Sequence, residues 1–81
     1  MNENLKNYNT AYTESFGISE DKLTDLKYQD IVEWDSVGHM GLIAALEESF
    51  QIEMDIDDII DFSSYQKGME IVAKYKIDLN E

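Results

Sequence analysis

The apolar residues of this chain recur at spacings of three and four, and no segment shows the alternation expected of a half-buried strand. Such spacing places apolar side chains on one face of a helix. The pattern is clear from residue 3 to residue 16, and Gly17 follows where helices commonly end in a left-handed residue. The residues of this first stripe are Leu5, Tyr8, Tyr12 and Phe16. The sequence therefore begins with a predicted amphipathic helix.

A long connection over 17–35 follows, with a predicted short helical turn over 21–26. Its apolar residues show no sustained period and are expected to anchor the connection to the rest of the domain. They are Ile18, Leu23, Leu26, Tyr28, Ile31 and Trp34. The second helix is predicted to begin at Asp35 or Ser36 and to end near Gln51.

Two further helices complete the prediction. A short third helix over 56–61 is introduced by an acidic run. The fourth is predicted to start after Ser63, where Ser63 and Gln66 match a capping box, and to continue to about Lys76. No repeat or interdomain linker is found. We therefore predict one all-α domain over 1–81, with three longer helices, one short helix and a long first connection.

The charge balance restricts the class of partner. Eighteen acidic residues face six basic ones, all lysines, which gives a net charge of −12. Without arginine the chain lacks the bidentate fork suited to phosphate, and like-charge repulsion opposes binding to nucleic acid or an anionic membrane. A basic protein surface is the expected partner. There is also no cysteine, so neither a disulfide nor a thiolate metal site can form.

Localisation and oligomeric state follow as expectations from the same properties. No apolar run approaches the roughly 20 residues of a membrane span, and the N-terminus lacks the features of a signal peptide. We expect a cytoplasmic protein without membrane insertion. The strong negative charge also favours a monomer.

The second helix carries two apolar stripes instead of one. The first is expected to face the core and contains His39, Leu42, Ile43, Leu46 and Phe50. The second consists of Val37, Met40 and Ala44, extended by Glu47 and Glu48. A helix in a small bundle needs one buried face, so the second stripe is predicted to be an exposed docking surface for a basic partner. The alternative is that a central helix buries both stripes.

Two glycines interrupt the start of this helix. Gly38 and Gly41 each cost roughly 1 kcal/mol relative to alanine in a helix interior. Such a departure from local preference is typical of a functional site. The glycines are expected to leave the backbone bare beside Ser36. The alternative is close packing against another helix, which is more plausible for Gly41 than for Gly38.

Ser36 has a structural and a functional interpretation. Asp35 or Ser36 is an ordinary N-cap, and the dipeptide alone is a weak motif. As a functional residue, Ser36 is a hydroxyl at the positive end of a helix, where an attached phosphodiester is stabilised.

Catalysis and metal binding are not predicted. His39 lies near Ser36 in the sequence but is expected to face the core, no third group is apparent, and Trp34 replaces the first glycine of a nucleophile elbow. The acidic run, which contains Asp55, Asp57 and Asp58, lacks the glycine and the final acid of a calcium loop. We therefore expect neither an enzyme nor a dedicated metal site.

The second helix and the residues after it closely resemble acyl carrier proteins. The similarity lies in WDSVGHM at 34–40 and LIAALEESF at 42–50, where an Asp-Ser motif opens the helix and an acidic pair followed by an aromatic residue closes it. Residues 57–62 resemble the short third helix of that family, and 63–65 resemble the start of the fourth.

The resemblance implies a four-helix carrier fold and a prosthetic group. A phosphopantetheinyl transferase, using coenzyme A and Mg²⁺, would attach 4′-phosphopantetheine to Ser36, beside Asp35, Val37 and Gly38. The arm would carry an acyl group as a thioester to ligases, acyltransferases or synthases. Partners would dock on the second and third helices. The expected docking residues are Val37, Met40, Ala44, Glu47, Glu48, Asp57 and Asp58.

Two positions depart from the fatty-acid-synthesis carriers. Where those proteins usually have acidic residues, this chain has Gly38 and Gly41. The resemblance therefore implies a free-standing carrier of a specialised biosynthetic pathway. An aminoacyl or peptidyl carrier with the same arm remains an alternative. A more distant alternative is an acidic helical interaction protein without a prosthetic group.

Overall fold

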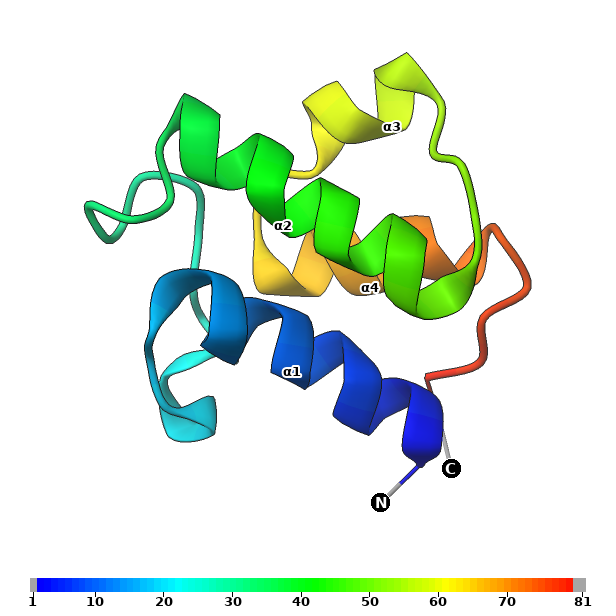
Figure 1. Cartoon of the computed structure of the whole chain (residues 1–81), viewed down its shortest axis with the longest axis horizontal. Coiled ribbons are helices and arrows are strands. Elements are labelled where there is room, and N and C mark those ends of the chain that lie inside the picture. Colours follow the sequence, from blue (N-terminus) through cyan, green and yellow to red (C-terminus); the bar gives the residue numbers. More distant parts are fainter. Residues whose placement is uncertain (1, 80–81) are drawn as a thin grey trace.

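The computed structural model describes residues 2–79. Helices α1 (Glu3–Phe16) and α2 (Ser36–Phe50) pack against each other as an antiparallel pair (Figure 1). The carboxamide oxygen of Asn2 caps α1 by accepting from the N–H groups of Asn4 and Leu5. Gly17 ends α1 with a φ of 67°, the left-handed conformation predicted there.

Two shorter helices cover this pair. Helix α3 (Ile56–Asp61) lies next to the first half of α2, and α4 (Tyr65–Ala73) lies behind α2 (Figure 1). The described residues thus form a compact all-α globule of 30 × 28 × 19 Å with four α-helices and no named strand. The predicted fold class, helix order and single short helix are confirmed. No helix of the described chain is both long and apolar enough to cross a membrane.

Aromatic side chains fill the centre. Tyr8, Tyr12 and Tyr65 pack with ring centroids 5.1 to 5.3 Å apart, and Trp34 lies against Tyr12 and Phe16. The Tyr8 hydroxyl donates to the Tyr65 carbonyl oxygen at 2.7 Å and therefore accepts from the Tyr12 hydroxyl at 2.9 Å. Burial raises the pKa of both Tyr8 and Tyr12. This hydrogen-bonded cluster joins α1 to α4.

The long connection is ordered by backbone pairing as well as by burial. Leu23, Leu26 and Trp34 are buried, as expected of anchors, whereas Tyr28 is 36% exposed. The Tyr28 N–H donates to the Ser63 carbonyl at 2.9 Å, and the Tyr65 N–H donates to the Leu26 carbonyl at 2.9 Å. The helical turn is a 3₁₀ segment, η1 (Glu20–Lys22), which is shorter than the predicted 21–26.

The predicted bounds of the fourth helix are wrong at both ends. The N-cap is Ser64, whose hydroxyl accepts from the Lys67 N–H at 2.9 Å. Ser63 cannot take this role because its carbonyl belongs to the pairing with the long connection, and the Gln66 side chain donates to the Thr24 carbonyl instead. The helix ends at Ala73, before a turn in which Lys76 has a φ of 67°.

Candidate functional site

The start of α2 separates the cap from the candidate attachment residue. Asp35 is the N-cap, and its Oδ1 accepts from the Gly38 N–H at 2.8 Å. Ser36 is the first helical residue and is exposed. Its hydroxyl has no hydrogen-bond partner within the described part of the chain, so it takes no part in capping. Of the two interpretations of the Asp-Ser pair, the structure gives the structural role to Asp35 alone.

The reason for Gly38 differs from the prediction. A Cβ atom at Gly38 would overlap the carbonyl oxygen of Glu33 in the preceding loop. The glycine is therefore required by the chain's own turn into α2, and not by the approach of an external group to Ser36. Gly41 shows the opposite situation, because a Cβ atom there would meet nothing within 4 Å. The alternative of close packing against another helix is thus wrong for Gly41, and Gly41 is the glycine that leaves the helix surface bare.

The two stripes of α2 have different surroundings. Leu42, Ile43 and Leu46 are buried, and His39 and Phe50 are partly buried beside them. Val37 is 79% exposed and Met40 is 53% exposed. Ala44 and Glu48 are exposed as well. The second stripe therefore faces solvent, and the alternative in which both stripes are buried is wrong.

Two of the predicted docking acids are already engaged within the protein. Glu47 is partly buried, and its Oε2 accepts from the Met54 N–H at 2.9 Å. Asp58 is buried, and its carboxylate accepts from the Lys74 ammonium at 2.5 Å and from the Tyr75 hydroxyl at 2.6 Å. Both carboxylates are therefore hydrogen-bonded within the protein, Glu47 to the segment before α3 and Asp58 to the residues after α4. Asp57 and Glu48 remain exposed.

An apolar pocket lies between α2, α3 and the long connection. Its volume is about 380 Å³. The lining residues are Ser36, His39 and Met40 of α2, Ile56, Ile59 and Ile60 of α3, and Tyr28, Phe62 and Ser63. Because Ser36 is exposed and also lines the pocket, its hydroxyl lies at the rim.

The sequence of α3 carries one feature that bears on this pocket. Ile56 and Ile60 stand four residues apart and therefore share one face of α3. They are 66% and 71% exposed. An apolar pair on a short acidic helix that the core does not bury indicates a surface with another use.

His39 also lines the pocket, and both of its ring nitrogens make hydrogen bonds within the protein. The buried Trp34 indole donates from Nε1 to His39 Nδ1 at 2.9 Å. An indole N–H can only donate, so Nδ1 is unprotonated and the neutral ring carries its proton on Nε2. That N–H donates to the Ile59 carbonyl at 2.8 Å. Neither nitrogen is available to take a proton from Ser36, so the described site lacks the base that a serine nucleophile needs.

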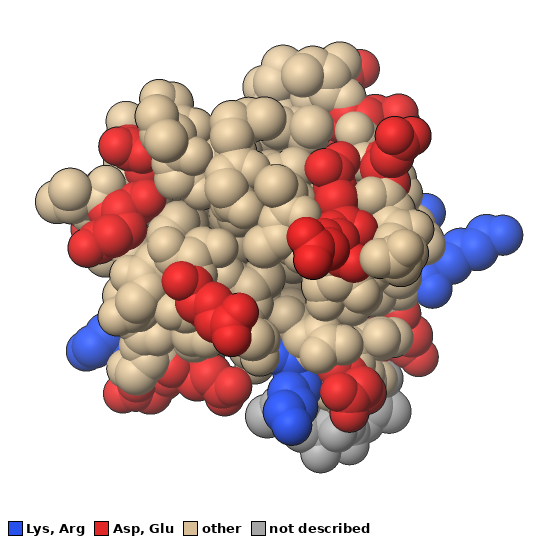
Figure 2. Space-filling model, viewed as in Figure 1, with Lys and Arg blue, Asp and Glu red and all other residues tan. Residues whose placement is uncertain are grey.

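The surface around the pocket is apolar in the middle and acidic at the sides. Figure 2 shows a band of uncharged side chains in the middle of this face, over the first half of α2, with acidic side chains on either side of it and basic ones nearer the edges. Within residues 2–79, no group of His, Cys, Asp or Glu side chains is arranged to hold a metal ion.

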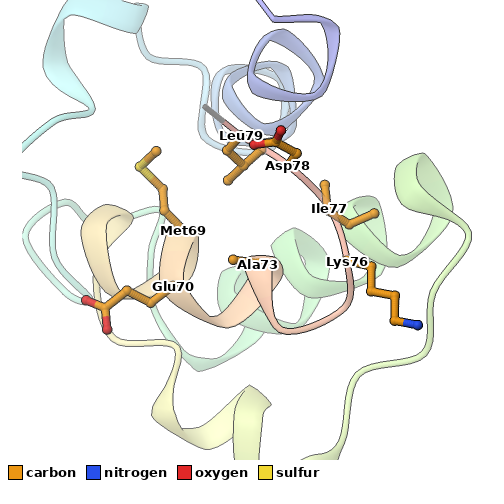
Figure 3. Close-up of a pocket in the computed structure, with 7 residues that line it drawn as sticks. All are labelled: Met69, Glu70, Ala73, Lys76, Ile77, Asp78 and Leu79. Atoms are coloured by element: carbon orange, nitrogen blue, oxygen red, sulfur yellow. The ribbon is translucent and has the colours of Figure 1, made fainter. Parts of the chain in front are cut away.

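A larger pocket of about 490 Å³ lies elsewhere, where the C-terminal segment passes over α4 (Figure 3). It is lined by Met69, Glu70, Ala73, Lys76, Ile77, Asp78 and Leu79. None of these residues belongs to the Ser36 site, and none carries a hydroxyl group. We therefore place the candidate site at the smaller pocket beside Ser36.

Comparisons with protein-family models, curated proteins and solved structures found no match to this chain, so its function is argued from its own residues and geometry.

Proposed function

We propose that this chain is a carrier protein of the acyl carrier type, with 4′-phosphopantetheine attached to Ser36. The observation that carries the proposal is an exposed serine hydroxyl, free of the cap, at the rim of an apolar pocket. The helix order also agrees with the four-helix carrier fold that the sequence resemblance implies. Ser36 stands at the first turn of a 15-residue helix, whose dipole favours an attached phosphodiester.

The chain itself performs none of the chemistry in this proposal. The Ser36 oxygen forms a bond to the phosphorus of the pantetheine side of coenzyme A. Adenosine bisphosphate leaves, and the serine proton passes to a base of the transferase. A base from outside is needed because His39 is already committed on both nitrogens. The prosthetic group would supply the thiol that carries a thioester, which a chain without cysteine cannot supply.

The pocket favours an acyl cargo over the aminoacyl alternative. Its lining contains no carboxylate, and most of its residues are isoleucine, methionine or aromatic. An uncharged aliphatic or aromatic acyl group gains by leaving water for such a site, at roughly 25 cal/mol per Å² of buried apolar surface. The ammonium group of an aminoacyl cargo would lose its hydration there without gaining a carboxylate.

The docking surface in this proposal is smaller than the sequence predicted. It consists of Val37, Met40, Ala44, Glu48 and Asp57, all exposed, with Ile56 and Ile60 added from α3. Glu47 and Asp58 are omitted because their carboxylates bind within the protein. An apolar centre with flanking acids suits enzymes that present basic residues around an apolar patch. A specialised pathway is proposed because Gly38 and Gly41 replace the usual acids.

Intact-mass analysis tests the attachment. The unmodified protein is incubated with coenzyme A, Mg²⁺ and a broad-specificity phosphopantetheinyl transferase. We expect one phosphopantetheine increment in the wild type and none in Ser36→Ala. Because the Ser36 hydroxyl makes no internal hydrogen bond, the variant should keep its helical circular dichroism. A wild type that gains no mass, or a Ser36→Ala variant that gains it equally, would favour the interaction protein without a prosthetic group.

Charge reversal tests the docking surface. Glu48→Lys and Asp57→Lys are compared with Glu70→Lys, an exposed site on α4 that changes the net charge by the same amount. We expect slower modification for the first two variants and a rate near that of the wild type for the third. If modification were slowed equally in all three variants, the transferase would recognise the net charge and not this surface. If none were slowed, Glu48 and Asp57 would not belong to the docking surface.

A further inference from the structure

Helix α3 is held on two sides by different kinds of contact. Toward the residues that follow α4, Asp58 binds Lys74 and Tyr75, and the Asp55 N–H donates to the Tyr75 hydroxyl at 2.9 Å. On its inner side, toward α2, the Ile59 carbonyl accepts from His39 Nε2. This is the one side-chain hydrogen bond recorded between α2 and α3 within residues 2–79. These side-chain hydrogen bonds join α3, which forms one wall of the pocket, to α2 and to the residues after α4.

The inner attachment continues into the core through Trp34. The planes of the Trp34 and His39 rings differ by 16°, with centroids 6.2 Å apart. Their nitrogens are 2.9 Å apart, which is closer than the roughly 3.5 Å separation of stacked rings. The two rings therefore lie edge to edge and nearly coplanar, joined by an N–H···N hydrogen bond. Because Trp34 is fully buried, this hydrogen bond holds the imidazole ring in one position.

We propose that His39 is a proton-sensitive latch between α2 and α3, which keeps the pocket beside Ser36 narrow while the ring is neutral and lets it widen when the ring is protonated. Protonation places a second donor, Nδ1–H, against the Trp34 N–H. The two donors repel each other, so the imidazole must leave its place and its hold on Ile59 is lost. Helix α3 then turns about its remaining attachment, from Asp58 to Lys74 and Tyr75, which moves Ile56, Ile59 and Ile60 away from α2.

The ring contacts of His39 are with aromatic side chains. Tyr28, Trp34 and Phe62 surround it, with centroids 5.5, 6.2 and 6.0 Å away. Tyr28 is the titratable side chain among them, and no carboxylate or lysine of the described chain forms an ion pair with the ring. The carboxylate of the neighbouring Asp35 is used on the Gly38 N–H.

The chain offers an unambiguous optical test because it contains one histidine and one tryptophan. Tryptophan fluorescence of the unmodified protein is followed from about pH 8 to about pH 5, where histidine ordinarily changes charge. The affinity for N-phenyl-1-naphthylamine, an uncharged apolar dye, is measured over the same range. We expect a fluorescence transition and a dye affinity that rises about fivefold, the ratio corresponding to one net hydrogen bond.

The matched control is His39→Gln. A glutamine amide can accept from Trp34 and donate to Ile59, but it does not titrate in this range. We expect this variant to bind the dye weakly at every pH and to show no fluorescence transition. Dye binding that is independent of pH in the wild type, or equally dependent in both proteins, would overturn the proposal.

Nitrogen-15 NMR gives a second test that needs no variant. At about pH 8 we expect the proton of the imidazole on Nε2. The Ile60 amide, which shares a peptide group with the Ile59 carbonyl, should shift together with the imidazole as pH falls. A ring protonated on Nδ1, or an Ile60 amide that does not follow the titration, would contradict the latch. The test uses protein without phosphopantetheine, so its outcome is independent of whether Ser36 is modified.

Discussion

Gly38 and Gly41 lie within one turn of each other on α2, yet their backbones face different surroundings. The Gly38 Cα faces the Glu33 carbonyl, which belongs to the turn that leads from Trp34 into the helix. The Gly41 Cα faces open space. A glycine is thus required at position 38 to avoid a clash, whereas the glycine at position 41 leaves part of the exposed surface of α2 without a side chain.

Alanine substitution should therefore have opposite effects at these positions. Gly38→Ala forces the Glu33 carbonyl to move, and we expect a loss of about 1–3 kcal/mol in the free energy of unfolding. Gly41→Ala replaces the poorer helix former in a free position and should gain roughly 0.5–1 kcal/mol. Urea denaturation measures both. Equal effects of the two substitutions would show that helix propensity alone accounts for these glycines.

The side-chain roles at this end of α2 were only partly available from the sequence. Periodicity correctly placed His39 toward the core stripe. Its hydrogen bond to Ile59 depends on how α3 returns to α2, and periodicity within one helix carries no information on that. The clash at Gly38 is similar, because it is set by the path of the preceding loop and not by residues within the helix.

At the scale of elements, the attachment of α3 to the residues after α4 is electrostatic. The hydrogen bond from Lys74, followed by that from Tyr75, holds the pKa of the Asp58 carboxyl below its ordinary value. The same contact raises the pKa of Lys74, so the two shifts agree in assigning a favourable charged pair. A depressed carboxyl pKa in the folded state stabilises the fold above the ordinary value of about 3.9, and this contribution is lost as the pH falls through the folded-state pKa.

We predict a pH-dependent difference in melting temperature between the wild type and Asp58→Asn. The difference should be largest near neutral pH and should shrink as the pH falls below about 4. Asp57→Asn is the control, because this exposed neighbour has no side-chain hydrogen bond or ion pair within the described chain. Thermal unfolding by circular dichroism across a pH series measures both differences. If the difference in melting temperature between the wild type and Asp58→Asn did not change with pH, the ionised Asp58 carboxylate would not be the source of the stability.

The sequence predicted elements better than it predicted how they fit together. Spacing and caps gave α1, α2 and α3 closely because their signals are local. The start of α4 was displaced by one residue, since Ser63 and Ser64 both suit an N-cap and the choice depends on pairing with Tyr28. The pocket was missed because it exists only between elements.

At the scale of the whole molecule, the excess of acidic side chains causes repulsion across a small protein. The net charge is −12, and the eighteen acidic residues, such as Asp58 in its ion pair with Lys74, have only six lysines to balance them. The shortest dimension is 19 Å. In about 0.01 M salt the screening length is roughly 30 Å, so acidic side chains on opposite faces still repel one another.

Added salt should therefore stabilise the fold. We predict that raising NaCl from about 0.01 M to about 0.5 M increases the melting temperature by about 4 °C or more, the shift that roughly 1 kcal/mol produces in a domain of this size. Differential scanning calorimetry measures it. Glu70→Lys, which has less net negative charge, should show a smaller increase. A melting temperature that does not respond to salt in either protein would contradict the prediction.

The contact between the two ends of the described chain has a practical consequence. The Asn4 side chain donates to the Asp78 carbonyl at 3.1 Å, so both ends meet at one place. In Figure 1 that place and the beginning of α2 lie at opposite corners of the molecule. A fusion partner, fluorescent label or solid support attached at either end would therefore project away from the Ser36 pocket. The chain can be immobilised or joined to another domain while its pocket stays open to solution.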